Sequence, residues 1–325
     1  MGVEFRIVLF APSGQKARTA ADAAFERIRE LDQKLSDYKK DSELNRLVRA
    51  GGPGKTLTVS EDLFAVLRLS ETYSELSEGA FDITVGPLTW LWRKARRLGR
   101  LPSDAERKAA LLRVGQDKVH LLPAKRAVRL DRADMALDLG GIAKGYAVDR
   151  ALDVLRAHGL PRALVDGSGD IAVGEAPPNQ PGWIIAVSPT GELETRSFVM
   201  RRGAIATSGD SYGRVVIDGK RYSHIVDPHT GFGLVDSAAV TVLAHDCTQA
   251  DALATVVSLL GAEKGIDVLR GIADVGAIIH RKEGAAPAAK TREIQYPEDL
   301  ERLPFVVSTA PVGRAKPARS TEKKP

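Results

Sequence analysis

Residues 138–149 read Asp-Leu-Gly-Gly-Ile-Ala-Lys-Gly-Tyr-Ala-Val-Asp, and this stretch joins the two kinds of pattern found in the chain. After Gly145, apolar residues recur at three and four positions as far as Leu155. Apolar residues at that spacing lie on one face of an α-helix. The stretch therefore predicts a glycine-rich turn that leads into an amphipathic helix.

Short β-rich runs surround this turn, and short turns separate most neighbouring runs. The runs are residues 126–130, 134–137, 162–165, 183–187, 196–201, 214–217, 237–244 and 275–280. A second amphipathic helix follows Thr248. Strands that outnumber helices and follow one another closely are typical of antiparallel pairing, because parallel strands need a long crossover. The sequence predicts an α+β fold with mixed or antiparallel sheets packed against helices.

The first hundred residues carry further helical patterns. Phe5–Phe10 predicts a strand, Thr19–Leu35 an amphipathic helix, and Ser60 the N-cap of another helix. Residues 88–99 also look helical and are basic on one side, at Arg93, Lys94, Arg96 and Arg97. We interpret that side as a solvated face.

Length and composition narrow the class of protein. A chain of 325 residues buries roughly 75% of its unfolded-state surface and needs no disulfide or metal to fold. The single cysteine, Cys247, excludes an intramolecular disulfide framework and a cysteine-based zinc site. No apolar run approaches the ~18 residues of a membrane span.

The net charge of +5 is unevenly distributed. Residues 308–325 hold five basic residues and one acidic residue, which leaves +1 for residues 1–307. The near-neutral body and its few aromatic residues speak against nucleic-acid binding. We expect one domain at residues 1–307 and a disordered basic tail at residues 308–325, which hold three prolines and no aromatic residue.

The glycine-rich turn is a candidate phosphate site. Gly140 and Gly141 allow a phosphate to approach the backbone, the helix N-terminus attracts it, and Lys144 adds a positive charge. The stretch matches neither a Walker A loop nor the GxGxxG pattern. A tight strand-to-helix turn without a ligand would have similar residues.

Two other clusters are candidates of the same kind. Asp166-Gly167-Ser168-Gly169-Asp170 suits an anion-binding nest or a plain hairpin turn. The hydroxyl-rich residues 206–211 offer donors to phosphate oxygens, and His224 follows where a strand enters an Asp-Pro turn.

Asp251 and Thr255 form the last candidate pair. Four residues apart on the second helix, they share one face. A carboxylate and a hydroxyl are poor zinc ligands but suit Mg²⁺, which completes its coordination with water and substrate phosphates. The alternative is an aspartate favoured by the helix dipole beside a packed threonine.

Taken together, these motifs resemble the ApbE family of FAD:protein FMN transferases. Seven blocks occur in family order over roughly residues 1–283: residues 35–47, 79–92, 138–149, 164–170, 207–210, 223–231 and 250–255. One departure is Gly167-Ser168-Gly169-Asp170, where the family has Gly-Gly-Asp. The resemblance implies a T-fold-like core and a Mg²⁺-dependent reaction, with Mn²⁺ as the alternative metal. That reaction cleaves FAD, joins FMN to a Thr or Ser hydroxyl of a partner protein and releases AMP.

The resemblance also implies site residues. The metal ligands are the Ala143 carbonyl, Asp251 and Thr255, and the candidate base is His224, with Asp251 as the alternative. Tyr38 is expected to stack on an FAD ring, and the Phe81-Asp82 turn to contact the adenosine. The full set expected to bind FAD is Met1, Tyr38, Ala80, Phe81, Asp82, Gly140, Lys144, Tyr146 and His224.

Other expectations concern partner and location. The chain lacks the family's acceptor motif, which runs roughly Asp/Ser-Gly-Ala/Ser-Thr/Ser-Thr/Ser, so the flavin should go to another protein. Met1-Gly2-Val3 falls on the family's Met-Gly-Thr block, which normally follows an export signal. We therefore expect a missing upstream segment and a periplasmic or lipid-anchored protein. The alternative functions are Mg²⁺-dependent hydrolysis of FAD and flavin binding without catalysis.

Overall fold

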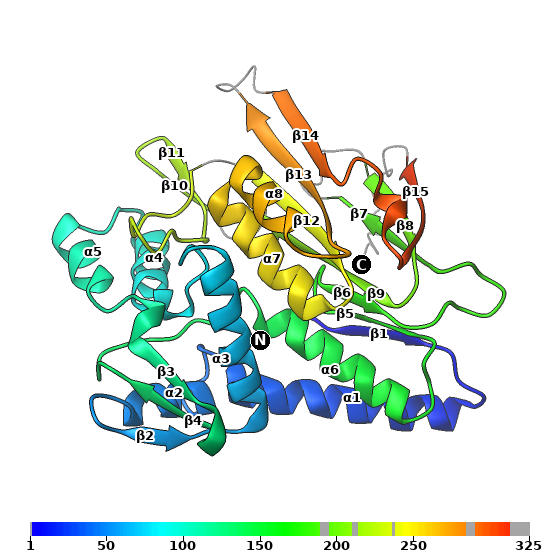
Figure 1. The fold of residues 1–325 in the computed structure, drawn as a ribbon, viewed down its shortest axis with the longest axis horizontal. Coiled ribbons are helices and arrows are strands. Elements are labelled where there is room, and N and C mark those ends of the chain that lie inside the picture. Colours follow the sequence, from blue (N-terminus) through cyan, green and yellow to red (C-terminus); the bar gives the residue numbers. More distant parts are fainter. Residues whose placement is uncertain (1, 189–194, 210–213, 236–237, 284–289, 313–325) are drawn as a thin grey trace, which may run out of the picture.

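A seven-stranded sheet runs through the middle of the molecule in the computed structural model, and strands from both halves of the chain build it (Figure 1). The structure describes residues 2–188, 195–209, 214–235, 238–283 and 290–312. The strand order is β1-β5-β6-β9-β12-β13-β14, and all the pairs in it are antiparallel. The strands are β1 (Arg6–Leu9), β5 (Ala163–Asp166), β6 (Ile171–Val173), β9 (Gly203–Gly209), β12 (Ala238–Ala244), β13 (Gly276–Glu283) and β14 (Lys290–Tyr296).

Smaller antiparallel sheets lie around the large one. One has the order β15-β8-β7, another β2-β4-β3, and β10 and β11 form a hairpin. Their strands are β2 (Thr56–Thr58), β3 (Val119–Leu122), β4 (Ala127–Leu130), β7 (Trp183–Val187), β8 (Thr195–Met200), β10 (Val215–Ile217), β11 (Lys220–Tyr222) and β15 (Val306–Val312). The predicted α+β fold with antiparallel sheets is confirmed.

Helices cover one face of the large sheet. α6 packs against β5 and β6, α7 against β9 and β12, and α1 runs alongside α6 (Figure 1). The helices are α1 (Gly14–Leu35), α2 (Glu43–Ala50), α3 (Glu61–Leu76), α4 (Gly86–Leu98), α5 (Asp104–Leu111), α6 (Ala143–Ala157), α7 (Cys247–Leu260) and α8 (Ala262–Arg270). The buried side chains of α3, α6 and α7 meet those of β12 in the largest apolar core. This packing places the N-termini of α6 and α7 side by side.

Serine side chains begin several helices. Ser60 accepts a hydrogen bond from the Leu63 N–H at the start of α3, as the sequence predicts. Ser13 accepts one from Lys16 N–H, so α1 begins at Gly14, before the predicted Thr19. The first turn of α1 is mostly polar and exposed, and hydrophobic periodicity therefore does not reveal it.

The predicted strand at residues 134–137 is wrong. Met135, Ala136 and Leu137 are buried, which accounts for the apolar run, but they belong to no strand. The backbone there passes close to Gly86 at the start of α4, where a Cβ would lie 2.6 Å from the Ala136 carbonyl oxygen. Contact with a helix takes the place of pairing with a strand.

The end of the domain differs from the expected boundary. β15 continues through residues 308–312 and pairs with β8, so the expected boundary after residue 307 falls inside a strand. The rest of the expected tail, residues 313–325, lies outside the described residues. Among the helices that the structure describes, none has the length and apolar character needed to cross a bilayer.

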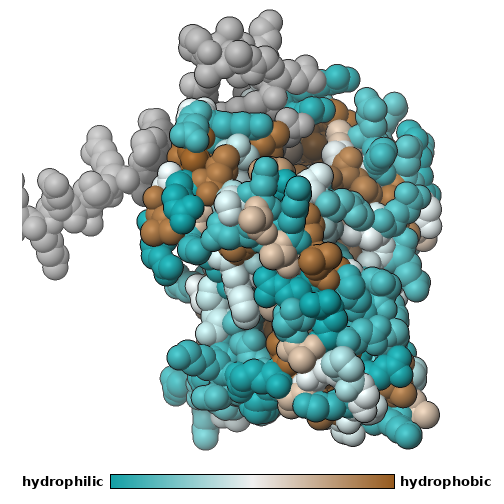
Figure 2. Space-filling view, turned by 90° about the vertical axis from the view of Figure 1, so that its left-hand side faces the viewer, coloured by the Kyte–Doolittle hydropathy of each residue, from teal (hydrophilic) through white to brown (hydrophobic). Residues whose placement is uncertain are grey.

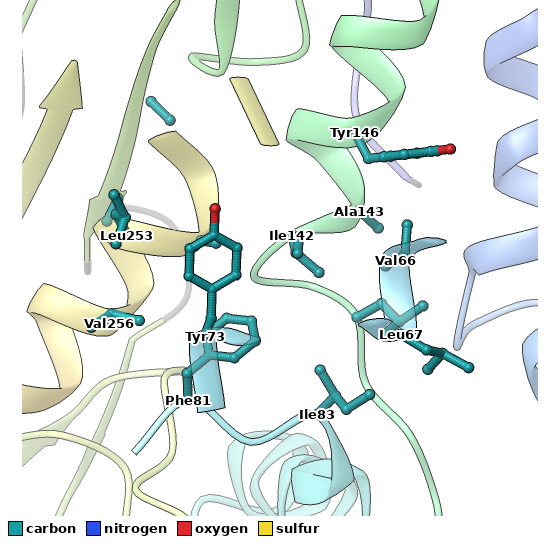
Figure 3. Close-up of a cluster of buried hydrophobic side chains, with 14 of the residues drawn as sticks. Val66, Leu67, Tyr73, Phe81, Ile83, Ile142, Ala143, Tyr146, Leu253 and Val256 are labelled. Carbon is teal, nitrogen blue, oxygen red and sulfur yellow. The ribbon is translucent and has the colours of Figure 1, made fainter. Parts of the chain in front are cut away.

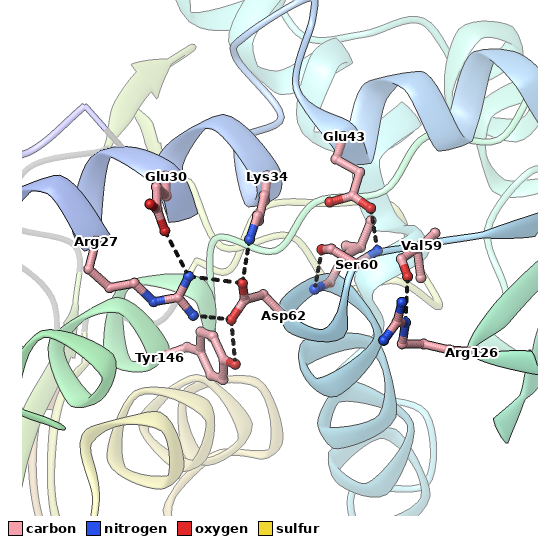
Figure 4. A network of polar contacts seen from close by, with 10 residues as sticks. Arg27, Glu30, Lys34, Glu43, Val59, Ser60, Asp62, Arg126 and Tyr146 are labelled. Carbon is pink, nitrogen blue, oxygen red and sulfur yellow. Dashed lines mark hydrogen bonds and ion pairs between the residues drawn. The ribbon is translucent and has the colours of Figure 1, made fainter. Parts of the chain in front are cut away.

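A buried carboxylate joins three helices (Figure 4). Asp62 of α3 pairs with Arg27 and with Lys34 of α1, whose Nζ lies 2.7 Å from Oδ2, and accepts the Tyr146 hydroxyl of α6 at 3.0 Å. Burial raises the pKa of Asp62, but the hydrogen bonds from Arg27 and Lys34 lower it further, to below its ordinary value of 3.8. The ionised carboxylate therefore stabilises the fold above about pH 3.8, and this contribution is lost as the pH falls through the folded-state pKa.

Replacing Asp62 by asparagine should destabilise the protein by about 1–3 kcal/mol at pH 7, because hydrogen bonds between charged groups are lost. Urea unfolding at pH 7 and pH 3 measures this, and the difference from the unchanged protein should shrink at pH 3. Glu26→Gln, which removes an exposed pair with Arg29, is the control and should have an effect under about 0.5 kcal/mol. A constant difference at both pH values would contradict the prediction.

Candidate active site

The glycine-rich turn ends at the N-terminus of α6. Ala143 is the first residue of that helix. Ile142 occupies the N-cap position, and no side chain there accepts a hydrogen bond from the helix. The first turn of a helix carries free N–H groups and a partial positive charge. The Gly145 N–H is satisfied from another helix, since it donates to Oδ2 of Asp251 on α7 at 3.0 Å.

Lys144 lies between two buried carboxylates. Its ammonium group pairs with Asp170 and lies 3.3 Å from Oδ1 of Asp251. Asp170 follows the turn after β5, so this contact brings the second sequence cluster next to the first. Asp170 is 2% exposed and Asp251 5% exposed. Two carboxylates and one ammonium leave the cluster with excess negative charge when both acids are ionised.

The pKa values reflect this surplus of acid. Burial, together with the nearby Asp251, raises the pKa of Asp170 to about 7, and Lys144 opposes the rise. Burial lowers the pKa of Lys144, but Asp251 and Asp170 outweigh it and hold the pKa well above its ordinary value. Lys144 is therefore a permanent positive charge at the helix N-terminus.

Helices α6 and α7 contact each other at Gly145 with backbone against backbone. A Cβ at this position would lie 2.2 Å from the carbonyl oxygen of Cys247 and 2.9 Å from Cβ of Asp251. No side chain fits in that space. The glycine thus sets how closely Asp251 approaches the start of α6.

Asp149 completes the junction from the other direction. This α6 carboxylate accepts the backbone N–H groups of Cys247 and Thr248, both at 2.8 Å, and the Thr248 hydroxyl. It satisfies N–H groups at the N-terminus of α7, while Asp251 of α7 satisfies one on α6. Burial raises the pKa of Asp149 to about 6. The sequence pattern around Asp149 does not reveal this role, because the role depends on a neighbouring helix.

A third element reaches the same place. A Cβ at Gly141 would lie 3.0 Å from the Thr255 hydroxyl oxygen and 3.2 Å from the Phe81 ring. The glycine turn, α7 and the turn at residues 79–82 therefore converge here (Figure 3). Phe81 itself is 3% exposed and packs edge-on against Tyr73, with ring centroids 6.0 Å apart. Its side chain belongs to the core, next to the buried Ala80.

Asp82 and Gln116 lie beside this turn. Oδ1 of Asp82 accepts the Thr84 N–H at 2.7 Å and the Thr84 hydroxyl at 2.6 Å, and burial raises its pKa. In the described part of the chain, both amide atoms of Gln116 are buried without a hydrogen-bond partner. Gln116 lines an open cleft of about 450 Å³ that also contains Glu71, Glu75 and Glu78. These acidic walls disfavour a diphosphate, whereas an amide with a free donor and acceptor suits a neutral polar group.

Tyr38 lies at the rim and connects with the glycine turn. It is 71% exposed, and the Arg93 guanidinium covers its ring at 4.1 Å from the centroid. Arg93 pairs with Asp37 at 2.6 Å and with Asp138 at 3.3 Å, and Asp138 accepts the Gly140 N–H at 2.9 Å. Burial and the neighbouring Asp138 raise the pKa of Asp37. Arg93 thus connects Tyr38 with the glycine turn through Asp138. From the sequence we expected it on a solvated face, so that interpretation is wrong for Arg93.

Tyr146 lies apart from the Lys144 carboxylates. It lies on the other side of Ile142 from Tyr73 (Figure 3), and its hydroxyl donates to Asp62. Burial and Asp62 raise its pKa to about 12. Through this hydrogen bond the hydroxyl helps to join α6 to α1 and α3, so its described contact is structural.

The remaining predicted residues have different surroundings. His224 is exposed on the loop after β11, which folds back on itself through a hydrogen bond from Ser223 N–H to the Leu234 carbonyl. Thr207 and Ser208 belong to β9, a strand that the sequence analysis missed, and the Thr207 hydroxyl pairs with that of Thr241. Met1 and Asp210 lie outside the described residues.

The donor set suits a hard divalent cation. The Ala143 carbonyl, Asp251 and Thr255 offer only oxygen, and a positive ion would compensate the excess negative charge of the Lys144 cluster. In the described ranges, no three His, Cys, Asp or Glu side chains are grouped for a metal. A soft metal such as zinc, which prefers nitrogen and sulfur, has no matching ligand set there.

Comparison with known sequences identifies a family and relatives that cover most of the chain. The model of the ApbE family matches residues 1–279. The FAD:protein FMN transferase of Vibrio cholerae serotype O1 is 32% identical over 275 residues, covering 82% of this chain and 81% of the relative. The FAD:protein FMN transferase of Treponema pallidum is 33% identical over 280 residues, covering 81% of this chain and 77% of the relative.

Solved structures match over nearly the whole chain. A histidine-to-glycine variant of the flavin transferase ApbE from Vibrio cholerae superposes with a TM-score of 0.81 at 29% identity, covering 91% of this chain and 94% of that structure. The apbe protein of Thermotoga maritima gives 0.78 at 30% identity, covering 89% and 94%. The chain therefore belongs to the ApbE family and is a transferase.

Proposed function

We propose that this transferase moves FMN from FAD to a Thr or Ser hydroxyl of a partner protein and releases AMP. The observation that carries the proposal is the Lys144 cluster, in which one ammonium and two buried carboxylates meet at a helix N-terminus beside Gly140 and Gly141. A permanent positive charge at the start of a helix and a place for a cation both suit a diphosphate.

Each residue has a part in the proposed reaction. Lys144 and the N-terminus of α6 bind the diphosphate and stabilise the charge that develops on the AMP leaving group. The acceptor hydroxyl attacks the FMN phosphorus, the bond to the AMP oxygen breaks, and His224 takes the hydroxyl proton, with Asp251 as the alternative base. A Mg²⁺ ion, or Mn²⁺ in its place, held by the Ala143 carbonyl, Asp251 and Thr255, would neutralise phosphate charge.

The rest of the proposed FAD site follows from the convergence of loops around Gly141. Tyr38 offers an exposed ring to the flavin, and the turn at Ala80, Phe81 and Asp82 offers its backbone and the neighbouring Gln116 amide to the adenosine. Gly140 allows the diphosphate to approach, and Met1 remains a proposed contact. Tyr146 is proposed to act indirectly, by fixing α6. The proposed setting is periplasmic or lipid-anchored, as the resemblance implies.

One experiment tests the proposed reaction. The protein is incubated with FAD, Mg²⁺ and a soluble test domain that carries an exposed Asp-Gly-Ala-Thr-Thr segment, and the mass of the domain is measured together with AMP. We expect the domain to gain one FMN, with one AMP released for each transfer. Free FMN and AMP beside an unmodified domain would indicate hydrolysis, and unchanged FAD would indicate binding only. Either result would contradict the proposal.

A further inference from the structure

One face of α4 carries positive side chains that are only partly paired with carboxylates in the described residues. Residues 86–100 contain five basic residues and no acidic one, in a chain whose total net charge is +5. At 100° per residue, Trp90, Arg93, Arg96 and Arg97 lie on the same side of the helix. We call these four residues the α4 arginine face.

The α4 arginine face borders the active site. Arg93 covers the Tyr38 ring and pairs with Asp138, which holds the Gly140 N–H. Arg96 is close enough to Tyr38 to oppose the rise in the pKa of its phenol. The face therefore continues outward from the rim at which the proposed flavin-stacking ring is exposed.

The outer part of the face lacks compensating charge. Arg93 has two carboxylate partners, whereas Arg96 and Arg97 are exposed and form no ion pair within the described residues. Trp90 is 48% exposed. Figure 2 views the side of the molecule on which α4 and α5 lie, and there separate hydrophobic side chains interrupt a mainly hydrophilic surface. Exposed arginine and tryptophan are the side chains most enriched at the centres of protein interfaces.

We propose that the α4 arginine face docks the acceptor protein through an acidic surface that surrounds the acceptor hydroxyl. The inference rests on the proposed function, because only a transferase must bring a folded partner to this rim. In the proposed reaction Arg96 and Arg97 are not needed to bind FAD, because the Lys144 cluster binds its diphosphate. Charge complementarity at a rim speeds association and selects partners.

The test compares two versions of the test domain, one with four acidic residues beside the Asp-Gly-Ala-Thr-Thr segment and one with their amide counterparts. Arg96→Glu/Arg97→Glu should raise the KM for the acidic version at least about 10-fold, with kcat and the KM for FAD within about twofold of the unchanged enzyme. The effect should shrink between 0.1 M and 1 M salt, because the screening length falls from about 10 Å to about 3 Å. The amide version should show little change.

Matched variants separate docking from folding. Lys16→Glu/Arg18→Glu makes the same change in charge at the opposite end of α1 from Tyr38, and it should leave the KM for the acidic version unchanged. Arg96→Lys/Arg97→Lys keeps the charge and should restore most of the low KM. Arg96→Gln/Arg97→Gln serves if the reversed variant does not fold, and it should have a smaller effect in the same direction.

Several results would overturn the inference. These are an unchanged KM for the acidic version, an equal rise in the KM for FAD, or binding to phosphatidylglycerol vesicles that depends on Arg96 and Arg97 without any effect on the domain. A failure of the proposed function is distinguishable, because the unchanged enzyme would then modify neither version. That result would remove the basis of this inference as well.

Discussion

Replacing Gly145 by alanine is expected to abolish activity and to destabilise the fold by about 3 kcal/mol or more. A Cβ at this position would lie 2.2 Å from the Cys247 carbonyl oxygen, a backbone atom that cannot turn aside as a flexible side chain could. α6 and α7 would have to move apart. The hydrogen bond from Gly145 N–H to Asp251 would then lengthen, and Asp251 would move away from Lys144.

Thermal and urea unfolding, circular dichroism and AMP release measure this result. Gly14→Ala is the matched control, because a Cβ there meets only the end of the Arg18 side chain, at 3.9 Å. Since alanine restricts the unfolded chain, that variant should be neutral or stabilised by up to about 1 kcal/mol. A Gly145→Ala protein with the stability and AMP release of the unchanged enzyme would show that the contact between α6 and α7 does not constrain the site.

Replacing Asp251 by asparagine should lower the rate of FMN transfer at least about 10³-fold, with the fold retained. Asparagine keeps the shape and can still accept the Gly145 N–H, but it removes the charge that faces Lys144 at 3.3 Å. It also removes the only carboxylate among the proposed metal ligands. Asp251→Ala should be at least as inactive and less stable, because the Gly145 N–H would lose its partner.

The measurements are the mass of the test domain, AMP release and the shift in unfolding temperature on addition of Mg²⁺. The shift should disappear in Asp251→Asn, which gives a readout of cation binding apart from catalysis. Asp267→Asn on α8 removes an exposed pair with Arg270 and should leave all three readouts unchanged. Normal transfer by Asp251→Asn would refute the assignment of this residue to the metal.

Much of the fold was predictable because local patterns and tertiary packing agree. The helices after Gly145 and Thr248 are regular in sequence and buried in the structure, and Ser60 caps α3 as predicted. β9 was missed because Gly203–Gly209 consists mainly of small and hydroxyl residues that resemble a loop. Its partners are β6 and β12, which are not adjacent to it in the chain. Such pairing leaves little local signal.

The candidate site was predictable as a set of motifs but not as an arrangement. The placement of Asp251 and Thr255 on one helix face indicated a metal site. The position of Lys144 after two glycines indicated a phosphate site. Arg93 and Asp149 escaped notice because each acts on a distant segment, Arg93 on Tyr38 and Asp149 on the start of α7. Tyr146 was expected at FAD, yet its hydroxyl meets Asp62, a partner 84 residues away.

By itself, the sequence determined the α+β class, the helices that carry the motifs and the chemical types of group available to a diphosphate. These follow from periodicity and side-chain chemistry, which are local. Only the tertiary structure decided which groups meet: Lys144 with Asp170 and Asp251, Gly141 with Thr255, and Arg93 with Tyr38. Those contacts depend on how closely α6, α7 and α4 pack, and a distance between segments far apart in the chain is set by the fit of whole surfaces.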